Sequence, residues 1–211
     1  MKIRYAMRSR PGGQTENSDC IRMKEENGIW LFAASDGCGS PGSARIASET
    51  VVGSLFGRFS WNQGSEHFLR NAMLTAQEAV LSRQASDQNL CDISASVAAL
   101  LIEGDIVSWA NAGSTRLYYF HRSEVAGGAM NHSVSARHPF HLTEEVQLHR
   151  EDSFLLSADG FWQNIDEDQM CMIRKNAVTP VQWLRRMSDV VKQNGEGRNM
   201  DNYSAVCIFA E

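Results

Sequence analysis

The chain contains no uninterrupted run of ~18 apolar residues, the length that a membrane-spanning helix needs. Its first ten residues are basic and no apolar segment follows them, so we expect no signal peptide. No internal repeat, low-complexity segment or linker rich in proline and serine divides the chain. These absences predict one domain over residues 1–211, and the 43% hydrophobic content is enough for one sizeable core.

Cysteine and positive charge are also sparse. The five cysteines are odd in number, widely separated and form no C-x-x-C pair, which favours free thiols in a reducing cytoplasm. The 20 Lys and Arg residues are outnumbered by 25 Asp and Glu residues, and the net charge of −5 argues against a nucleic-acid-binding protein. We therefore expect a cytoplasmic monomer that binds neither nucleic acid nor membranes.

Three separated acidic turns are the most informative feature that is present. Asp36 and Asp159 each follow an apolar run and are each followed by glycine, whereas Asp201 immediately precedes an apolar run. Each aspartate should therefore lie at the end of a buried strand. Carboxylates in such positions, with glycines that leave the backbone carbonyl accessible, suit a hard divalent cation. Taken singly, an Asp-Gly pair is more often an ordinary turn, so the inference depends on the three together.

The pattern of apolar residues predicts an α+β fold. Residues with a helical period occur in two successive segments and again late in the chain, where Thr179 and Pro180 mark a helix start. Short β-rich runs joined by hairpin signals imply antiparallel sheets, with the helices as outer layers. We expect strands near 2–7, 20–24, 29–34, 93–102, 106–111, 115–120, 146–149, 153–158 and 203–209, and helices over 44–59, over 66–83 and from 179.

Seven motifs in order resemble those of the metal-dependent protein serine/threonine phosphatases, the PPM or type 2C family, in a short bacterial form. One motif alone is weak, but the order and spacing over nearly the whole chain are specific. The motifs are Asn17-Ser18-Asp19, Asp36-Gly37-Cys38-Gly39, residues 93–100, residues 109–116, Asn131-His132-Ser133, residues 155–162 and Asp201-Asn202.

The resemblance implies a four-layer αββα sandwich of two antiparallel sheets flanked by helices. It also implies a site for Mg²⁺ or Mn²⁺, with two ions expected. In the family, the aspartate matching Asp36 bridges both ions and the carbonyl of the glycine matching Gly37 adds a ligand. The residues matching Asp159 and Asp201 complete the first ion, and Asp19 would be an outer carboxylate. The stretch between residues 132 and 146 is short, so the flap that many members carry beside the active site should be short or absent.

The chemistry implied by the resemblance is hydrolysis of phosphoserine or phosphothreonine by a metal-bridging hydroxide, with Asp36 and Asp159 as the catalytic carboxylates. The substrate would be a protein phosphorylated by a Ser/Thr kinase. Two positions depart from the pattern here. Ser18 replaces a glutamate that serves the second ion, and Gln14 stands where an arginine usually holds the phosphate. Arg10 or Arg8 could substitute for that arginine.

Two further departures are Ser114, which replaces an aspartate of a third metal site, and Cys38, which occupies a position of varied identity in the family. These departures, and the open site that a missing flap would leave, keep two alternatives open. One is a pseudophosphatase, a catalytically weakened protein that acts as a binding or regulatory module. The other is a metal-dependent phosphoesterase that acts on nucleotides or small phosphates.

Overall fold

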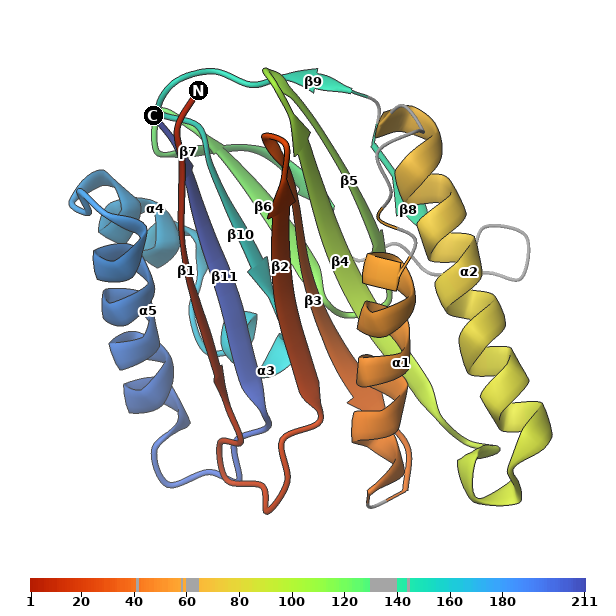
Figure 1. Ribbon diagram of the computed structural model, residues 1–211. Coiled ribbons are helices and arrows are strands. Elements are labelled where there is room, and N and C mark those ends of the chain that lie inside the picture. Colours follow the sequence, from red (N-terminus) through yellow and green to blue (C-terminus); the bar gives the residue numbers. More distant parts are fainter. Residues whose placement is uncertain (41, 58, 60–64, 130–139, 144) are drawn as a thin grey trace.

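The computed structural model describes residues 1–40, 42–57, 59, 65–129, 140–143 and 145–211. Two antiparallel sheets lie face to face, and helices cover the outer side of each sheet (Figure 1). The four layers therefore follow the order helix, sheet, sheet, helix. This arrangement confirms the predicted α+β sandwich.

The first sheet, sheet A, has the spatial strand order β1-β11-β10-β6-β7. Its strands are β1 (Ile3–Arg10), β6 (Arg116–His121), β7 (Glu124–Ala129), β10 (Ser153–Ser157) and β11 (Tyr203–Ala210). The second sheet, sheet B, has the order β2-β3-β4-β5-β8, and β9 also pairs with β5. Its strands are β2 (Asp19–Glu26), β3 (Ile29–Cys38), β4 (Ser94–Glu103), β5 (Ile106–Ala112), β8 (His141–Leu142) and β9 (Val146–Gln147).

Two long helices cover sheet B and the C-terminal helices cover sheet A (Figure 1). On sheet B these are α1 (Ser43–Gly57) and α2 (Ser65–Ser86), followed by the short 3₁₀ turn η1 (Gln88–Leu90). On sheet A they are α3 (Asp159–Trp162), α4 (Glu167–Lys175) and α5 (Pro180–Gly195).

The core is layered because most strands are buried on both faces. In β11, Val206 and Ile208 pack between the two sheets, whereas Ala205 and Cys207 pack against the helices that cover sheet A. Successive side chains of a strand point to opposite faces, so a strand between two layers needs apolar residues at nearly every position. This explains the continuous apolar run before the chain end and fixes the position of Asp201 at the start of β11.

The local signals that the sequence carries are confirmed where they are strongest. Asn27 and Gly28 join β2 to β3 and both have positive φ, 53° and 81°, as a two-residue hairpin turn requires. The Thr179 side chain accepts a hydrogen bond from the Gln182 backbone N–H, and Pro180 occupies the first turn of α5. The turn residues thus set the end of β2 and the start of β3, and the N-cap and the proline set the start of α5.

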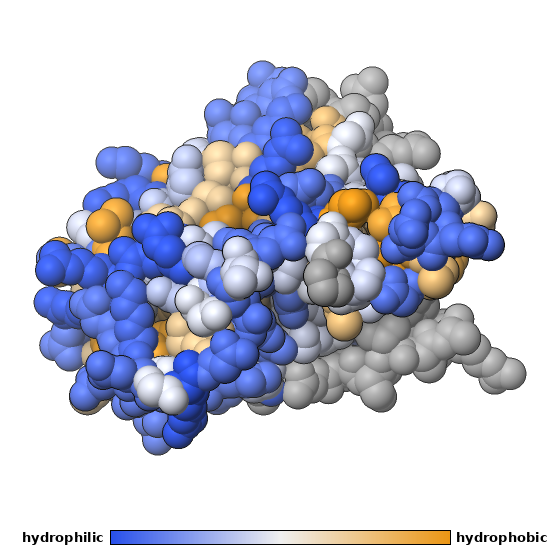
Figure 2. All heavy atoms as spheres, turned by 90° about the horizontal axis from the view of Figure 1, so that it is seen from below, coloured by the Kyte–Doolittle hydropathy of each residue, from blue (hydrophilic) through white to orange (hydrophobic). Residues whose placement is uncertain are grey.

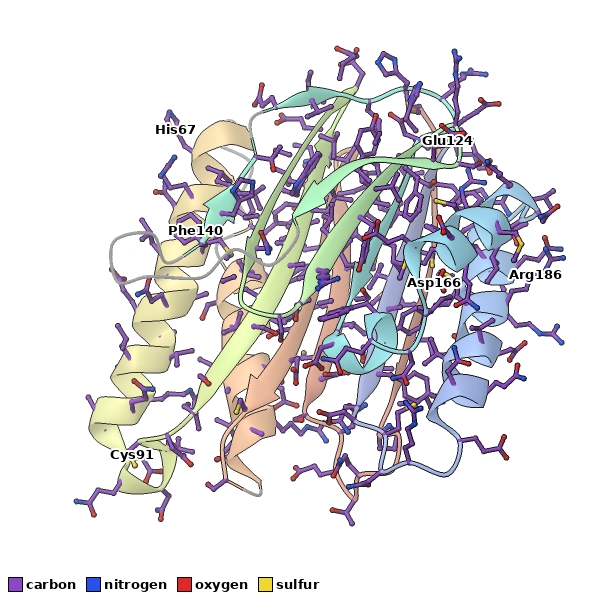
Figure 3. The ribbon with its side chains drawn as sticks, turned by 180° about the vertical axis from the view of Figure 1, so that it is seen from behind. His67, Cys91, Glu124, Phe140, Asp166 and Arg186 are labelled. Atoms are coloured by element: carbon purple, nitrogen blue, oxygen red, sulfur yellow. The ribbon has the colours of Figure 1, made fainter. Side chains whose placement is uncertain are left out.

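The sequence did not predict η1, β7, β8, α3 or α4 (Figure 3, where Asp166 immediately precedes α4). Helix α4 has a complete capping box between Asp166 and Gln169 but buries only Met170 and Arg174. Its apolar stripe is therefore too short for periodicity to reveal. Helix α3 has only four residues, and the glycines of β7 carry no strand signal.

Some other expectations can be compared with the described residues. All five cysteines are free, as their spacing predicted. Among the described residues, no helix has the length and apolar character needed to cross a lipid bilayer. The prediction about a short flap falls mostly on residues 130–139 and 144, which lie outside the described part of the chain.

Candidate metal centre

Sheet B contributes two aspartates to the candidate site. Asp19 opens β2 and lies directly opposite Asp36 on β3 in the antiparallel register. The strand end is held in place by Ser35, whose hydroxyl donates to the Ser96 carbonyl at 2.7 Å. The pairing explains why two carboxylates 17 positions apart in the sequence become neighbours.

Sheet A contributes the other two aspartates from adjacent strands, β10 and β11. Asp159 follows β10 and opens α3, whereas Asp201 lies just before β11. A Cβ atom added to Gly160 would lie 2.2 Å from the Asn202 carbonyl oxygen, so only glycine allows the two turns to touch. The three predicted acidic turns therefore lie at the same end of the two sheets, toward the bottom of Figure 1.

Close backbone packing also fixes the turn at Asp36. A Cβ atom on Gly37 would lie 1.9 Å from the Ala44 carbonyl oxygen, so β3 and the start of α1 approach closely only because this residue is glycine. The Gly37 N–H donates to the Ser18 carbonyl at 3.3 Å. The Gly37 position is thus closely packed between α1 and the start of β2.

The four aspartates share one electrostatic environment. Burial raises the pKa of Asp36 to about 7, with further contributions from the charges of Asp159 and Asp201. Burial is also the main reason that the pKa of Asp19 is raised to about 8; the Ser204 hydroxyl opposes this rise and the other three carboxylates add to it. The pKa of Asp159 is also raised, first by burial and then by Asp201. The protein alone therefore holds Asp19, Asp36 and Asp159 poorly in their charged form.

Several oxygens of this cluster are buried without a hydrogen bond. Both carboxylate oxygens of Asp19 are buried from solvent and accept no hydrogen bond of acceptable geometry. The same is true of Oδ1 of Asp159. Buried polar oxygens without partners are costly and rare. A cation would satisfy these oxygens and offset the mutual repulsion of the four carboxylates.

The donor set suits a water-rich centre. Among the described residues, no three His, Cys, Asp or Glu side chains are close enough to hold one ion by themselves. Mg²⁺ and Mn²⁺ accept oxygen ligands, and Mg²⁺ commonly keeps several waters and only one or two protein carboxylates. The carboxylate oxygens of Asp36, Asp159 and Asp201 fit such a centre if water supplies the remaining ligands.

Asn202 organises the loop before β2. Its side chain is 2% exposed, and its amide nitrogen donates to the carbonyls of Pro11 and Glu16, both at 2.9 Å. Its amide oxygen accepts from the Ser18 backbone N–H at 2.7 Å and from the Ser18 hydroxyl at 2.6 Å. Sequence reasoning assigned Asn202 no role in the site, although the Asp-Asn motif was the available signal.

The positions that depart from the family pattern have structural partners. The Ser18 hydroxyl is bound to Asn202, and Gln14 is exposed. The Ser114 hydroxyl donates to Ser96 at 3.3 Å, and the Ser114 carbonyl accepts from the Trp162 indole at 3.0 Å. Ser18 and Ser114 therefore stabilise turns around the site without supplying a carboxylate.

Arg10 ends β1 and pairs with Tyr203 of β11. Its side chain is exposed and lines a cavity together with Lys192 and Arg198, on the α5 side of sheet A. One of its terminal nitrogens donates to the Ser9 carbonyl at 3.0 Å. Its role in binding the phosphate of the substrate stays a prediction.

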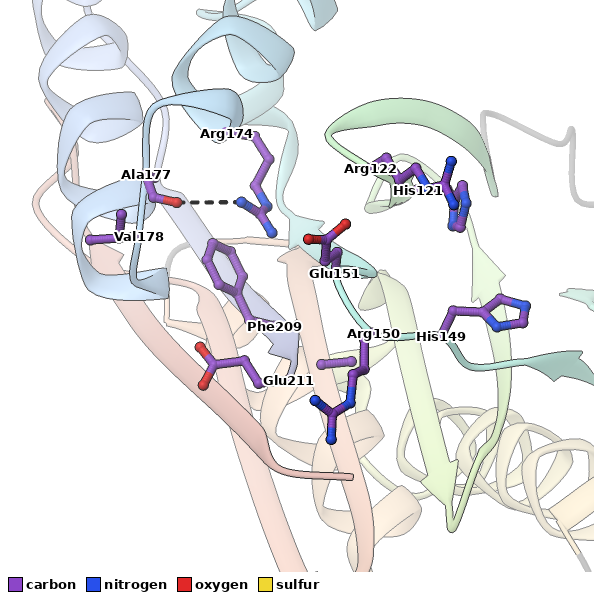
Figure 4. A pocket seen from close by; sticks show the side chains of 11 residues that line it. His121, Arg122, His149, Arg150, Glu151, Arg174, Ala177, Val178, Phe209 and Glu211 are labelled. Atoms are coloured by element: carbon purple, nitrogen blue, oxygen red, sulfur yellow. Dashed lines mark hydrogen bonds between the residues drawn. The ribbon is translucent and has the colours of Figure 1, made fainter.

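A large cavity of about 680 Å³ lies at the opposite end of the sheets (Figure 4). It is lined by residues such as His121, Arg150 and Glu211, and Glu211 is at the far end of β11 from Asp201. None of the four aspartates lines it. The candidate metal centre is therefore defined by its carboxylates and not by the size of a cavity.

Comparison with known proteins agrees with this geometry. The model of a protein family described as protein phosphatase 2C matches residues 8–202. No curated protein matches the chain in sequence. The chain belongs to the protein phosphatase 2C family, which places it among the phosphoprotein phosphatases.

Solved structures share the fold at low sequence identity. The serine/threonine phosphatase PstP/Ppp of Mycobacterium tuberculosis is 18% identical, with a TM-score of 0.82 and coverage of 99% of both chains. The catalytic domain of PstP, described in complex with two manganese ions, is 17% identical over 98% of this chain and 97% of its own, with a TM-score of 0.85. PppA of Pseudomonas aeruginosa, described as a regulatory component of T6SS, is 20% identical over 100% and 99%, with a TM-score of 0.80.

The raised pKa values predict how the metal-free protein responds to pH. Asp19 and Asp36 bind protons more tightly in the folded protein than in the unfolded chain, so stability should fall as pH rises from about 4 to about 8. Between pH 5 and pH 8 we expect a loss of about 5 kcal/mol and a fall in Tm of roughly 10–20 °C. Thermal unfolding in the presence of a chelator measures it.

The control for this prediction is the variant Asp19→Asn/Asp36→Asn, which should lose most of the fall in Tm. Mn²⁺ should raise the Tm of the unaltered protein more at pH 8 than at pH 5, because ligands must lose protons to bind a metal. An equal slope in the variant and the unaltered protein would show that other groups control the pH dependence.

Proposed function

We propose that this protein is an active, metal-dependent phosphatase that hydrolyses phosphoserine and phosphothreonine in proteins. The observation that carries the proposal is the convergence of Asp19, Asp36, Asp159 and Asp201 at one end of the sandwich, with buried oxygens that lack partners. Residues 1–211 would form one functional domain, since the strands that hold these aspartates share the core between the two sheets.

In this proposal, the Asp36, Asp159 and Asp201 carboxylates and the Gly37 carbonyl would hold the ions. Two Mg²⁺ or Mn²⁺ ions, when bound, would neutralise the phosphate and activate a water molecule as the nucleophile. Asp19 would orient water from the outer shell. Packing around Gly37 and Gly160 would hold the carboxylates at fixed positions, which favours direct attack of water on phosphorus.

The phosphate needs a further cation or donor, and Arg10 is our proposed candidate. Gln14 is exposed near the same loop and can donate a hydrogen bond but carries no charge. The substrate would be a protein phosphorylated by a Ser/Thr kinase, and the chain would act as a cytoplasmic monomer.

The test is release of phosphate from a phosphothreonine peptide with and without millimolar Mn²⁺. We expect turnover that depends on Mn²⁺ and stops when a chelator is added. A parallel panel of small phosphomonoesters separates a protein phosphatase from a general phosphoesterase, which would prefer the small substrates.

Absence of turnover would favour the pseudophosphatase. The favouring observation is that Ser18 offers no carboxylate and that its hydroxyl is already bound to Asn202. In that case Mn²⁺ should still raise the Tm of a well-folded protein that binds a phosphopeptide without hydrolysing it. Measurable native turnover excludes this alternative.

A further inference from the structure

A basic pocket lies next to the loop that carries Asp201. It has a volume of about 430 Å³ and, among the described residues, its lining includes three cationic side chains and no carboxylate. The cations are Arg10 at the end of β1, Lys192 in the last turn of α5, and Arg198 in the loop after α5. The whole chain has a net charge of −5, so this concentration of positive charge is local.

The three cations have no acidic partner within the described residues. Arg10 donates to the Ser9 carbonyl, and no ion pair involves Arg10, Lys192 or Arg198. Lys192 complements the negative end of the α5 dipole, which accounts for one of the three positions. Arg198 has no such local explanation, and its charge, together with that of Lys192, remains available to a second anion.

Closely packed residues line part of the basic pocket. A Cβ atom on Gly195 would lie 2.2 Å from the Met200 sulfur, and Tyr203 beneath is 5% exposed. The Arg198 loop is held by two backbone hydrogen bonds, from Arg198 N–H to Gly195 at 3.2 Å and from Met200 N–H to Arg198 at 2.9 Å. A packed floor and a cationic rim suit a short side chain that ends in an anion.

The basic pocket and the metal centre share one loop. The Gly13 N–H donates to the Met200 carbonyl at 2.7 Å, and a Cβ atom on Gly12 would lie 2.2 Å from the Asp201 carbonyl oxygen. Gly12 and Gly13 both line the pocket. Figure 2 looks at this end of the molecule, and the surface on its left, over α5, is largely hydrophilic. A polypeptide bound at the metal centre can therefore reach the pocket with a neighbouring residue.

We propose that the basic pocket binds a second anionic side chain of the protein substrate, close in sequence to the phosphorylated residue that is hydrolysed. The inference rests on the proposed phosphatase function. The shared chemistry is a carboxylate or a second phosphate, and Arg and Lys bind both through charge-assisted hydrogen bonds. The enzyme would thus prefer acidic or multiply phosphorylated segments.

The test compares three phosphothreonine peptides of equal length: one with neutral flanking residues, one with flanking aspartates and one with a flanking phosphoserine. We expect KM to be about tenfold lower for the anionic peptides than for the neutral one, with similar kcat. The advantage should shrink as salt rises, because the pocket is open to solvent. Greater preference for phosphoserine over aspartate would identify phosphate as the ligand.

The variant Lys192→Ala/Arg198→Ala should lose the preference between anionic and neutral peptides, while Lys192→Arg/Arg198→Lys should retain it. The matched control Arg185→Ala removes an exposed charge from α5 outside the pocket and should keep the preference. Equal KM values for the three peptides with an active enzyme would overturn the basic-pocket proposal alone. No hydrolysis of any peptide or of p-nitrophenyl phosphate would instead overturn the proposed function.

Discussion

The substitution Asp36→Asn should reduce Mn²⁺-dependent phosphatase activity about a thousandfold, since a metal site supplies several kcal/mol of transition-state stabilisation. Asp36 is the proposed ligand shared by both ions and lies opposite Asp19 on the adjoining strand. Initial rates of phosphate release from a phosphothreonine peptide, at several Mn²⁺ concentrations, measure the effect. A loss that higher Mn²⁺ partly restores would indicate weaker metal binding.

Folding is not expected to limit this experiment. Burial already raises the pKa of Asp36 to about 7, so a neutral side chain should leave the metal-free fold at least as stable. Asp168→Asn is the matched control. Asp168 is exposed on α4, so this substitution removes the same charge at a position away from the site. Full activity in a folded Asp36→Asn protein would show that the metal assignment is wrong.

The substitution Asn202→Ala should destabilise the protein by about 4 kcal/mol, because it deletes four buried hydrogen bonds and leaves their partners unsatisfied. The affected partners are the carbonyls of Pro11 and Glu16 and the backbone N–H and hydroxyl of Ser18. For a chain of this length the Tm should fall by roughly 8–16 °C. Thermal and urea unfolding of the metal-free protein measure this change.

Asn176→Ala is the control for Asn202, because the Asn176 amide is exposed and donates a single hydrogen bond, to the Met172 carbonyl at 2.9 Å. Asn176→Ala should lower the free energy of unfolding by less than about 1 kcal/mol. In Asn202→Ala, the affinity for Mn²⁺ should fall as well, since the loop at Ser18 and the turn at Asp201 are no longer joined. A Tm equal to that of the control would mean that the loop is held by other contacts.

The sequence alone was sufficient for features that depend on neighbouring residues. The hairpin at Asn27 and Gly28 and the start of α5 at Thr179 follow from backbone and capping preferences. The apolar runs beside Asp36 and Asp159 identified buried strands, since a strand between two layers must be apolar on both faces. Together with the ordered motifs, these runs predicted the sandwich and the acidic strand ends.

The short elements needed the tertiary structure. Helix α4 has nine residues, of which Met170 and Arg174 are buried and Cys171 and Ile173 are partly buried, so its apolar stripe is too short to stand out in the sequence. The sequence also could not assign Ser18. Its hydroxyl meets Asn202, 184 positions away, and that contact exists only because the loop before β2 packs against the start of β11.

Sequence by itself therefore determined which residues could bind a metal, since ligand chemistry is a property of each side chain and its turn. The tertiary structure alone decided how these residues are arranged. It placed Asp19 opposite Asp36 by strand register, and it brought the Asp159 turn against Asp201 through the absence of a side chain at Gly160. The tertiary structure also places Arg10 on the α5 side of sheet A, beside Lys192 and Arg198, because alternate residues of a strand point to opposite faces.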